Sequence, residues 1–403
     1  MSPSSRREFL NDLGRGMLAA GLGATLARDL GFSAAFADDG AEALPLGDYE
    51  ALVRLLQSTP ADELQPILAA KLRKGETDLR TLVCAGALAN AQTFGGCDYV
   101  GFHTAMALLP ALEMSRASPP GREALPVLKV LYRNTQQIQS VGGASRKTLF
   151  ALHAEEHAVE GDPGKRIRDA CRETDVARAE ELLAAAGDSP RAAFNAMQPA
   201  VQDDIDVHRF VFAHRTYGLA GLLGKEHAHT LLRQSVRLCV DHERGRIARK
   251  SGDPPVRALL PKLLDRYQLA GLEPGDRDPG DEAVEGLAET IYAGPPERAA
   301  EAAAAALAEG VSLEVVGEAI SLASNALALR QGSDRWRTHG DAAGVHASDA
   351  TNSWRDMARV IDARHAVSGL IVAAYHSAAH SPFATPAYPT DEPFDYPQFR
   401  WRG

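Results

Sequence analysis

Residues 296–325 read PERAAEAAAAALAEGVSLEVVGEAISLASN, and this stretch decides the fold class. Alanine is the best helix former, and the unbroken run from Ala302 to Ala306 is typical of a helix rather than of a half-buried strand. Gly310 follows the first segment and Ser312 precedes the second, and these are the residue types that end one helix and cap the next. The stretch therefore predicts a helical hairpin.

A second copy of this pattern lies near the start of the chain, where residues 60–90 read PADELQPILAAKLRKGETDLRTLVCAGALAN. The sequence GFH at 101–103 is echoed in the same way by GVH at 344–346. We expect an internal duplication with two related halves, about 42–250 and 256–380, packed around a pseudo-twofold axis. Chance similarity between alanine-rich hairpins is the alternative. The observation behind the duplication is that the two members of each of three residue pairs are 235 positions apart: Gly75 and Gly310, Thr77 and Ser312, and Asn90 and Asn325.

The remainder of the 403-residue chain has the same helical periodicity and no convincing strand alternation. This predicts one large all-α domain at 38–380, followed by an extended proline- and aromatic-rich tail at 381–403. The tail would lie on the body of the domain or on a neighbouring subunit of a homo-oligomer. The expected helices are 48–56, 61–72, 79–92, 103–112, 124–138, 176–185, 192–202, 219–248, 256–269, 281–292, 296–307, 313–329 and 353–380.

Composition excludes several classes of protein. Hydrophobic residues make up 45% of the chain, which excludes a disordered protein, and aromatic residues only 6%, which disfavours a β-sandwich or barrel. The net charge of −10 and the absence of a long lysine or arginine run argue against nucleic-acid binding. No segment has eighteen uninterrupted apolar residues, so we expect no permanent membrane anchor.

The first residues carry a specific motif. The sequence SRREFL at 5–10 precedes a weakly apolar stretch at 17–26 and a small-x-small pattern at Ala35-Phe36-Ala37. It resembles the twin-arginine export signal, which implies recognition by the twin-arginine machinery, cleavage near Ala37 and a periplasmic or extracellular mature protein. That route exports folded proteins, often with a cofactor already inserted, so it favours a metal or an organic cofactor.

Thirteen histidines suggest what this cofactor would be, because imidazole is a common ligand for iron, copper and zinc. Under the duplication, His103 and His346 would face each other across the axis. His214 and His229 are fifteen residues apart, as are His365 and His380, so one member of each pair would complete a four-histidine site.

His208 could reach this site from the preceding turn, and His376 lies four residues before His380, a good two-ligand spacing on a helix. Asp349, Tyr217 and Glu243 are candidate proton-transfer or ligand-orienting groups. The full set of candidate ligands for a divalent metal is His103, His153, His157, His208, His214, His229, His346, His365 and His380.

Three stretches resemble the questin oxidase-like family of all-helical oxygenases. They are GFH at 101–103 running into ALLPAL, HRFVFAH at 208–214 running into GLA, and HASDATNS at 346–353. The resemblance implies non-haem iron held by several histidines, oxygenase activity and an apolar or aromatic small-molecule substrate. The chain departs from the family in its export signal and in having no lysine after Lys262.

Two other hypotheses belong to different classes. The first is a helical-repeat binding protein without chemistry, which would need regular repeats throughout. The second is a zinc hydrolase, because HAEEH at 153–157 matches a zinc-peptidase string in which His153 and His157 bind zinc and Glu156 is the base. Zinc and copper therefore remain alternatives to iron.

The export motif generates the first prediction. Replacing Arg6 and Arg7 together by lysine will keep the protein in the cytoplasm, because the paired arginines are the recognised element. Fractionation followed by N-terminal sequencing measures this, with a wild-type mature chain starting near Asp38 as the reference. Unchanged export of the variant would remove the signal assignment.

Overall fold

A computed structural model describes residues 42–152, 161–187, 189–330 and 343–381. These residues form α-helices and no strand, with one isolated bridge between Arg277 and Val311, so the all-α prediction is confirmed. Residues 1–37 and 382–403, on which the expected signal and nearly all of the expected tail fall, lie outside the described residues.

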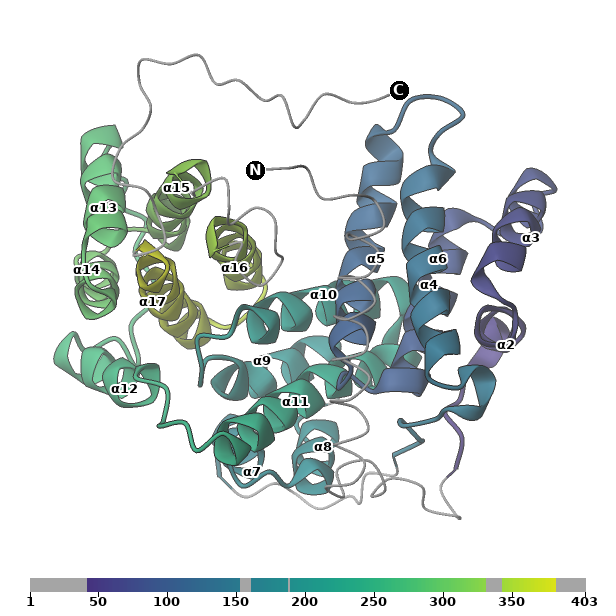
Figure 1. Cartoon of the computed structure of the whole chain (residues 1–403). Helices are drawn as coiled ribbons and strands as arrows, with labels where there is room; N and C mark the ends of the chain where they lie inside the picture. The colour runs from purple at the N-terminus through teal and green to yellow at the C-terminus, as the bar shows by residue number, and fades with distance from the viewer. Residues whose placement is uncertain (1–41, 153–160, 188, 331–342, 382–403) are drawn as a thin grey trace, which may run out of the picture.

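The helices form three groups (Figure 1). The N-terminal unit, on the right of Figure 1, contains α2 (Glu50–Ser58), α3 (Ala61–Arg73), α4 (Leu79–Phe94), α5 (Tyr99–Ala117) and α6 (Ala124–Ser140). The C-terminal unit, on the left, contains α13 (Asp281–Ala293), α14 (Pro296–Ala308), α15 (Leu313–Arg330), α16 (Ala343–Ala358) and α17 (Ala363–Ala379). The connecting group is α7 (Pro163–Arg172), α8 (Val176–Ala184), α9 (Pro190–Val201), α10 (Val207–Leu223), α11 (Lys225–Ala248) and α12 (Val256–Arg266).

The two outer units share several of their helix contacts. Helix α3 packs on α6 as α14 packs on α17, and α4 contacts α2, α5 and α6 as α15 contacts α13, α16 and α17. The two units span 50–140 and 281–379, which is less than the two expected halves, because α7 to α12 lie between them. By these contacts α5 corresponds to α16, and these are the two helices that begin near His103 and His346.

Helix α10 connects the two units. Its first half, including Phe210 and Ala213, is buried in the core shared by the connecting and C-terminal groups. Its second half, including Leu219 and Leu223, is buried in the core of the N-terminal unit. Because α10 packs against both α5 and α16, its N-terminal turn lies between the starts of the two corresponding helices.

Short local signals set these helix starts. The carboxylate of Asp98 accepts from the backbone N–H of Gly101 at 2.6 Å, and that of Asp206 from the N–H of His208 at 2.9 Å, which satisfies helix donors that have no partner within the helix. A Cβ added to Gly101 would lie 2.6 Å from the ring of Phe94. Glycine in the GFH motif is therefore required for close packing.

Three expected boundaries were wrong. The helix expected at 219–248 is divided between α10 and α11 by Gly224, whose φ of 90° suits glycine. The helix expected at 353–380 is two helices, with Asp362 preceding the second. The third is the start of α7, where no helix was expected: Asp162 accepts from the N–H groups of Gly164 and Lys165, and Pro163 takes the first helical position.

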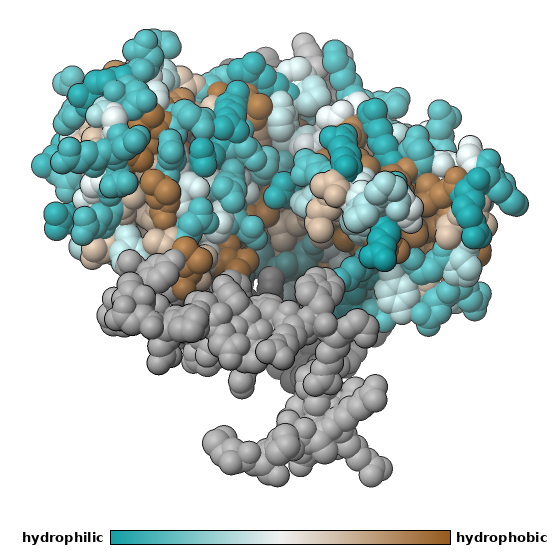
Figure 2. Space-filling model, turned by 90° about the horizontal axis from the view of Figure 1, so that it is seen from above, coloured by the Kyte–Doolittle hydropathy of each residue, from teal (hydrophilic) through white to brown (hydrophobic). Residues whose placement is uncertain are grey.

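The outer face of the molecule is mostly hydrophilic. Viewed from above, teal side chains cover most of both outer units, with smaller brown areas among them (Figure 2). Exposed large hydrophobic residues occur on different helices, for example Met114 on α5, Ile247 on α11 and Leu329 on α15. Among the described residues, no helix combines the length and the apolar character needed to cross a membrane.

Close packing inside the C-terminal unit generates a stability prediction. A Cβ at Gly369 of α17 would lie 2.6 Å from ring carbons of the buried Trp354, so Gly369→Ala will lower the free energy of unfolding by about 1–3 kcal/mol. Gly286 of α13 has nothing within 4 Å of an added Cβ, so Gly286→Ala will leave stability unchanged or raise it by up to ~1 kcal/mol. Chemical denaturation measures both, and equal effects would contradict the packing.

Candidate functional site

A cleft of about 840 Å³ opens where α5, α10, α11, α16 and α17 meet. Tyr99 and Phe102 of α5 line one side of it. Five histidines also line it: His208 of α10, His242 of α11, His346 of α16, and His376 and His380 at the end of α17. The described structure therefore brings imidazoles from four helices to one opening.

His208 lies at the centre of this histidine cluster. Its ring centroid is 4.9 Å from that of His103 and 5.9 Å from that of His346. Tyr99 and Phe102 surround the same rings, with Phe102 stacked on His103 at 4.7 Å. His103 and His346, which come from corresponding helices, thus both contact one imidazole of α10.

Asp206 joins two of the histidines. Its carboxylate is 3.0 Å from Nδ1 of His208 and 3.7 Å from Nδ1 of His242. Burial by itself would raise the pKa of Asp206, but the hydrogen bond from His208 and the proximity of His242 outweigh it and lower this pKa. An ionised Asp206 therefore accepts a hydrogen bond from the Nδ1–H group of His208 and fixes the orientation of this ring.

Three of the imidazoles have a defined tautomer. Nδ1 of His103 is 2.6 Å from the carbonyl oxygen of Tyr99, and Nδ1 of His380 is 2.8 Å from that of His376. A carbonyl only accepts, so Nδ1 carries the proton in each ring, as it does in His208 beside Asp206. The neutral tautomer then has its lone pair on Nε2, the nitrogen that would bind a metal.

Burial keeps the neighbouring rings neutral. His376 is 1% exposed, and burial, followed by the nearby His380, lowers its pKa well below the ordinary value. Its Nδ1 has no hydrogen-bond partner among the described residues. Burial also lowers the pKa of His242 and of His380, and a neutral imidazole is the form that binds metals.

The rings are not arranged around a common point. Among the residues that the structure describes, no group of three or more histidine, cysteine, aspartate or glutamate side chains is positioned to hold a metal ion. His208 meets His103 and His346 edge to face, at interplanar angles of 69° and 67°. Metal binding here would require these imidazoles to reorient.

Three of the predicted ligands lie elsewhere. His214 is 3.7 Å from Asp356, and burial, followed by Arg215, lowers its pKa to about 4. His229 is near the start of α11, and His365 lies at the opposite end of α17 from His380 and lines a different cleft. The fifteen-residue spacing does not bring both members of a pair to the site, because of these four histidines only His380 lines the histidine cleft.

The other predicted residues also have defined places. Tyr217 stacks on Phe194 at 4.1 Å, and Asp349 is exposed on α16. His153 and His157 lie outside the described residues. Sequence reasoning missed Asp206 and His242. An aspartate two residues before His208 is a helix N-cap signal that could have revealed Asp206.

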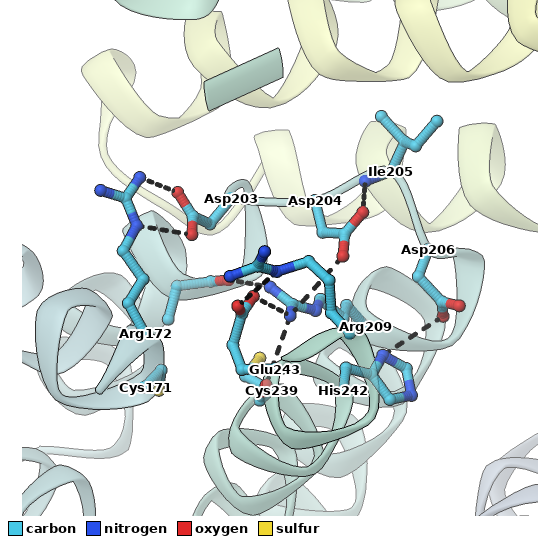
Figure 3. A network of polar contacts seen from close by, with 12 residues as sticks. Cys171, Arg172, Asp203, Asp204, Ile205, Asp206, Arg209, Cys239, His242 and Glu243 are labelled. Carbon is cyan, nitrogen blue, oxygen red and sulfur yellow. Dashed lines mark hydrogen bonds and ion pairs between the residues drawn. The ribbon is translucent and has the colours of Figure 1, made fainter. Parts of the chain in front are cut away.

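Glu243 belongs to a buried ion network behind the cleft (Figure 3). The guanidinium of Arg209, 1% exposed, donates to Glu243 at 2.8 Å and lies 3.6 Å from Asp204. Arg257 contacts the same glutamate and also Asp203, at 2.9 Å. Burial would raise the pKa of Glu243, but Arg209 outweighs it and lowers the pKa, so this carboxylate is a permanent counter-ion.

Comparison of the chain with protein-family models, curated proteins and solved structures finds no match.

The ion network generates a prediction about Glu243. Glu243→Gln will lower the free energy of unfolding by about 3–5 kcal/mol, because it leaves the buried Arg209 without its main counter-ion. Glu181→Gln, which breaks the exposed pair with Arg178, will cost less than about 1 kcal/mol. Denaturant unfolding of both variants measures the difference, and similar small losses would show that Glu243 has no structural role.

Proposed function

We propose that the protein is an exported metalloenzyme that binds a divalent metal, iron, through the histidine cluster and acts as an oxidoreductase. The observation that carries the proposal is the contact of His208 with both His103 and His346, with Asp206 on the other nitrogen of His208. A carboxylate–histidine pair of this kind is the usual support of a metal-binding imidazole.

The spacing of the rings fits a shared metal. Two imidazoles on one tetrahedral ion, each at a metal–nitrogen distance of about 2.1 Å, have ring centroids roughly 5 Å apart. The centroid distances from His208, 4.9 and 5.9 Å, are close to this value. His103, His208 and His346 would hold the metal, and His376 and His380, which line the same cleft, are candidates for a further ligand.

The resemblance, rather than the donor set, favours iron among the metals. Neutral imidazoles bind iron, copper and zinc, and the resemblance to the questin oxidase-like family favours iron. Bound iron would supply the redox chemistry with dioxygen that side chains lack. Asp206 would accept the hydrogen bond from Nδ1–H of His208 and so keep Nε2 available. Tyr99 and Phe102 would provide an apolar wall for an apolar or aromatic substrate.

The size of the cleft supports a small-molecule substrate, since its 840 Å³ lies within the range of such sites. Its far wall is charged, with Asp241 of α11 and with Arg246 and Arg249 near the end of α11. We therefore expect a substrate that combines an apolar or aromatic part with polar substituents. The twin-arginine motif supports a periplasmic or extracellular place for this reaction.

Metal analysis tests the proposal. Mature protein isolated from the exported fraction will contain about one iron per chain, measured by mass spectrometry of the metals. His208→Ala will lose at least about nine-tenths of this metal, because His208 is the imidazole that contacts both of the others. His229→Ala, on the neighbouring helix α11 and outside the cleft, will retain it.

Other outcomes would contradict the proposal in distinguishable ways. Metal retained in His208→Ala would remove the assignment of the site. Zinc that is lost only in His153→Ala would favour the hydrolase hypothesis instead. Protein exported in folded form without metal, and unable to take up iron after export, would favour a binding protein without chemistry.

A further inference from the structure

A second cleft, of about 330 Å³, lies between α7, α12 and α17. The turn between α9 and α10 separates it from the histidine cleft, because Asp203 lines the second cleft while Asp204 and Asp206 line the first. The proposed metal chemistry uses none of the residues of the second cleft. Its volume is at the lower end of the range for small-molecule sites.

One wall of the second cleft is cationic. Lys165, Arg168 and Arg172 reach it from successive turns of α7, Arg257 from α12 and Arg364 from α17. Three carboxylates also line the cleft, Asp162, Asp203 and the exposed Asp265. Positive side chains therefore outnumber negative ones in the lining.

The existing ion pairs do not use all of this positive charge. Arg172 and Arg257 both contact the carboxylate of Asp203, Arg257 also pairs with Glu243 and Asp253, and Arg364 is 3.3 Å from Asp162. Within the described ranges, Arg168 pairs with the exposed Asp169 of its own helix and with no other carboxylate. Lys165 has no ion-pair partner among the described residues, so at least one cation is available to an anionic ligand.

Apolar side chains also line this cleft. Helix α12 contributes Val256, Leu260 and Leu264, and Pro199 of α9 faces the same space. Leu260 and Leu264 are only half-buried, although both pack against the core. The cleft therefore offers two kinds of surface to a ligand. Its partly exposed apolar side chains suit an apolar body, and its guanidinium groups suit an anion.

We propose that this second cleft binds a small carboxylic acid with an apolar body. The carboxylate would lie against Lys165 and Arg168, and the apolar body against Leu260 and Leu264 of α12. This site is independent of the metal, so it does not depend on the proposed oxidoreductase function.

Isothermal titration calorimetry with three compounds that share one alkyl chain tests the head group. Octanoate will bind the full mature protein with a stoichiometry of one, whereas octanol and octyltrimethylammonium will bind at least about tenfold more weakly. Raising the salt concentration to about 0.5 M will weaken octanoate binding, because its attraction to the cations is screened. Equal affinity for the three head groups, or no binding of octanoate, would overturn the proposal.

Variants locate the binding. The double variant Lys165→Gln with Arg168→Gln will weaken octanoate binding at least about tenfold, and Leu260→Asp will do so from the apolar part of the lining. Arg178→Gln on the adjacent α8, also an exposed arginine but outside the cleft, is the matched control and will bind as wild type. Circular dichroism checks that each variant is folded. Unchanged octanoate binding in both the double variant and Leu260→Asp would place the ligand elsewhere and refute the site.

Discussion

The burial of Arg209 constrains the centre of the molecule. A guanidinium that is 1% exposed is stable there only if its charge is matched, and Glu243 of α11 matches it at 2.8 Å, with Asp204 nearby. This pairing ties the start of α10 to α11 and fixes the acidic turn at 203–206. Since Asp206 belongs to that turn, the same constraint that neutralises Arg209 also sets the position of the carboxylate that orients His208.

The position of α10 between two similarly packed units explains how distant histidines meet. Helices α5 and α16 hold corresponding places in the N-terminal and C-terminal units, and both contact α10. His103 and His346 stand near the starts of these helices, so the N-terminal turn of α10 lies between them. The turn at 203–206 is also a boundary, because the cationic second cleft opens on its other side.

The sequence predicted what depends on local patterns. Helical periodicity and Gly–Ser punctuation indicated the all-α fold and the helices on either side of Gly310. The GFH and GVH motifs pointed to His103 and His346, which both contact His208. Sequence could not rank the remaining histidines, because equal spacing along one helix says nothing about which end faces the cleft. His365 and His380 illustrate this limit, because they lie at opposite ends of α17. Asp206 and His242 come together only through the packing of α10 on α11, which no local pattern encodes.

The most direct test of the central claim is anomalous diffraction from crystals of the metal-loaded mature protein, measured at the iron absorption edge. We expect one peak in the histidine cleft, about 2.1 Å from an imidazole nitrogen of each of His103, His208 and His346. A peak elsewhere in the molecule, for example near His365 in the second cleft, would contradict it. So would iron-loaded crystals in which these three imidazoles keep their edge-to-face packing and coordinate nothing.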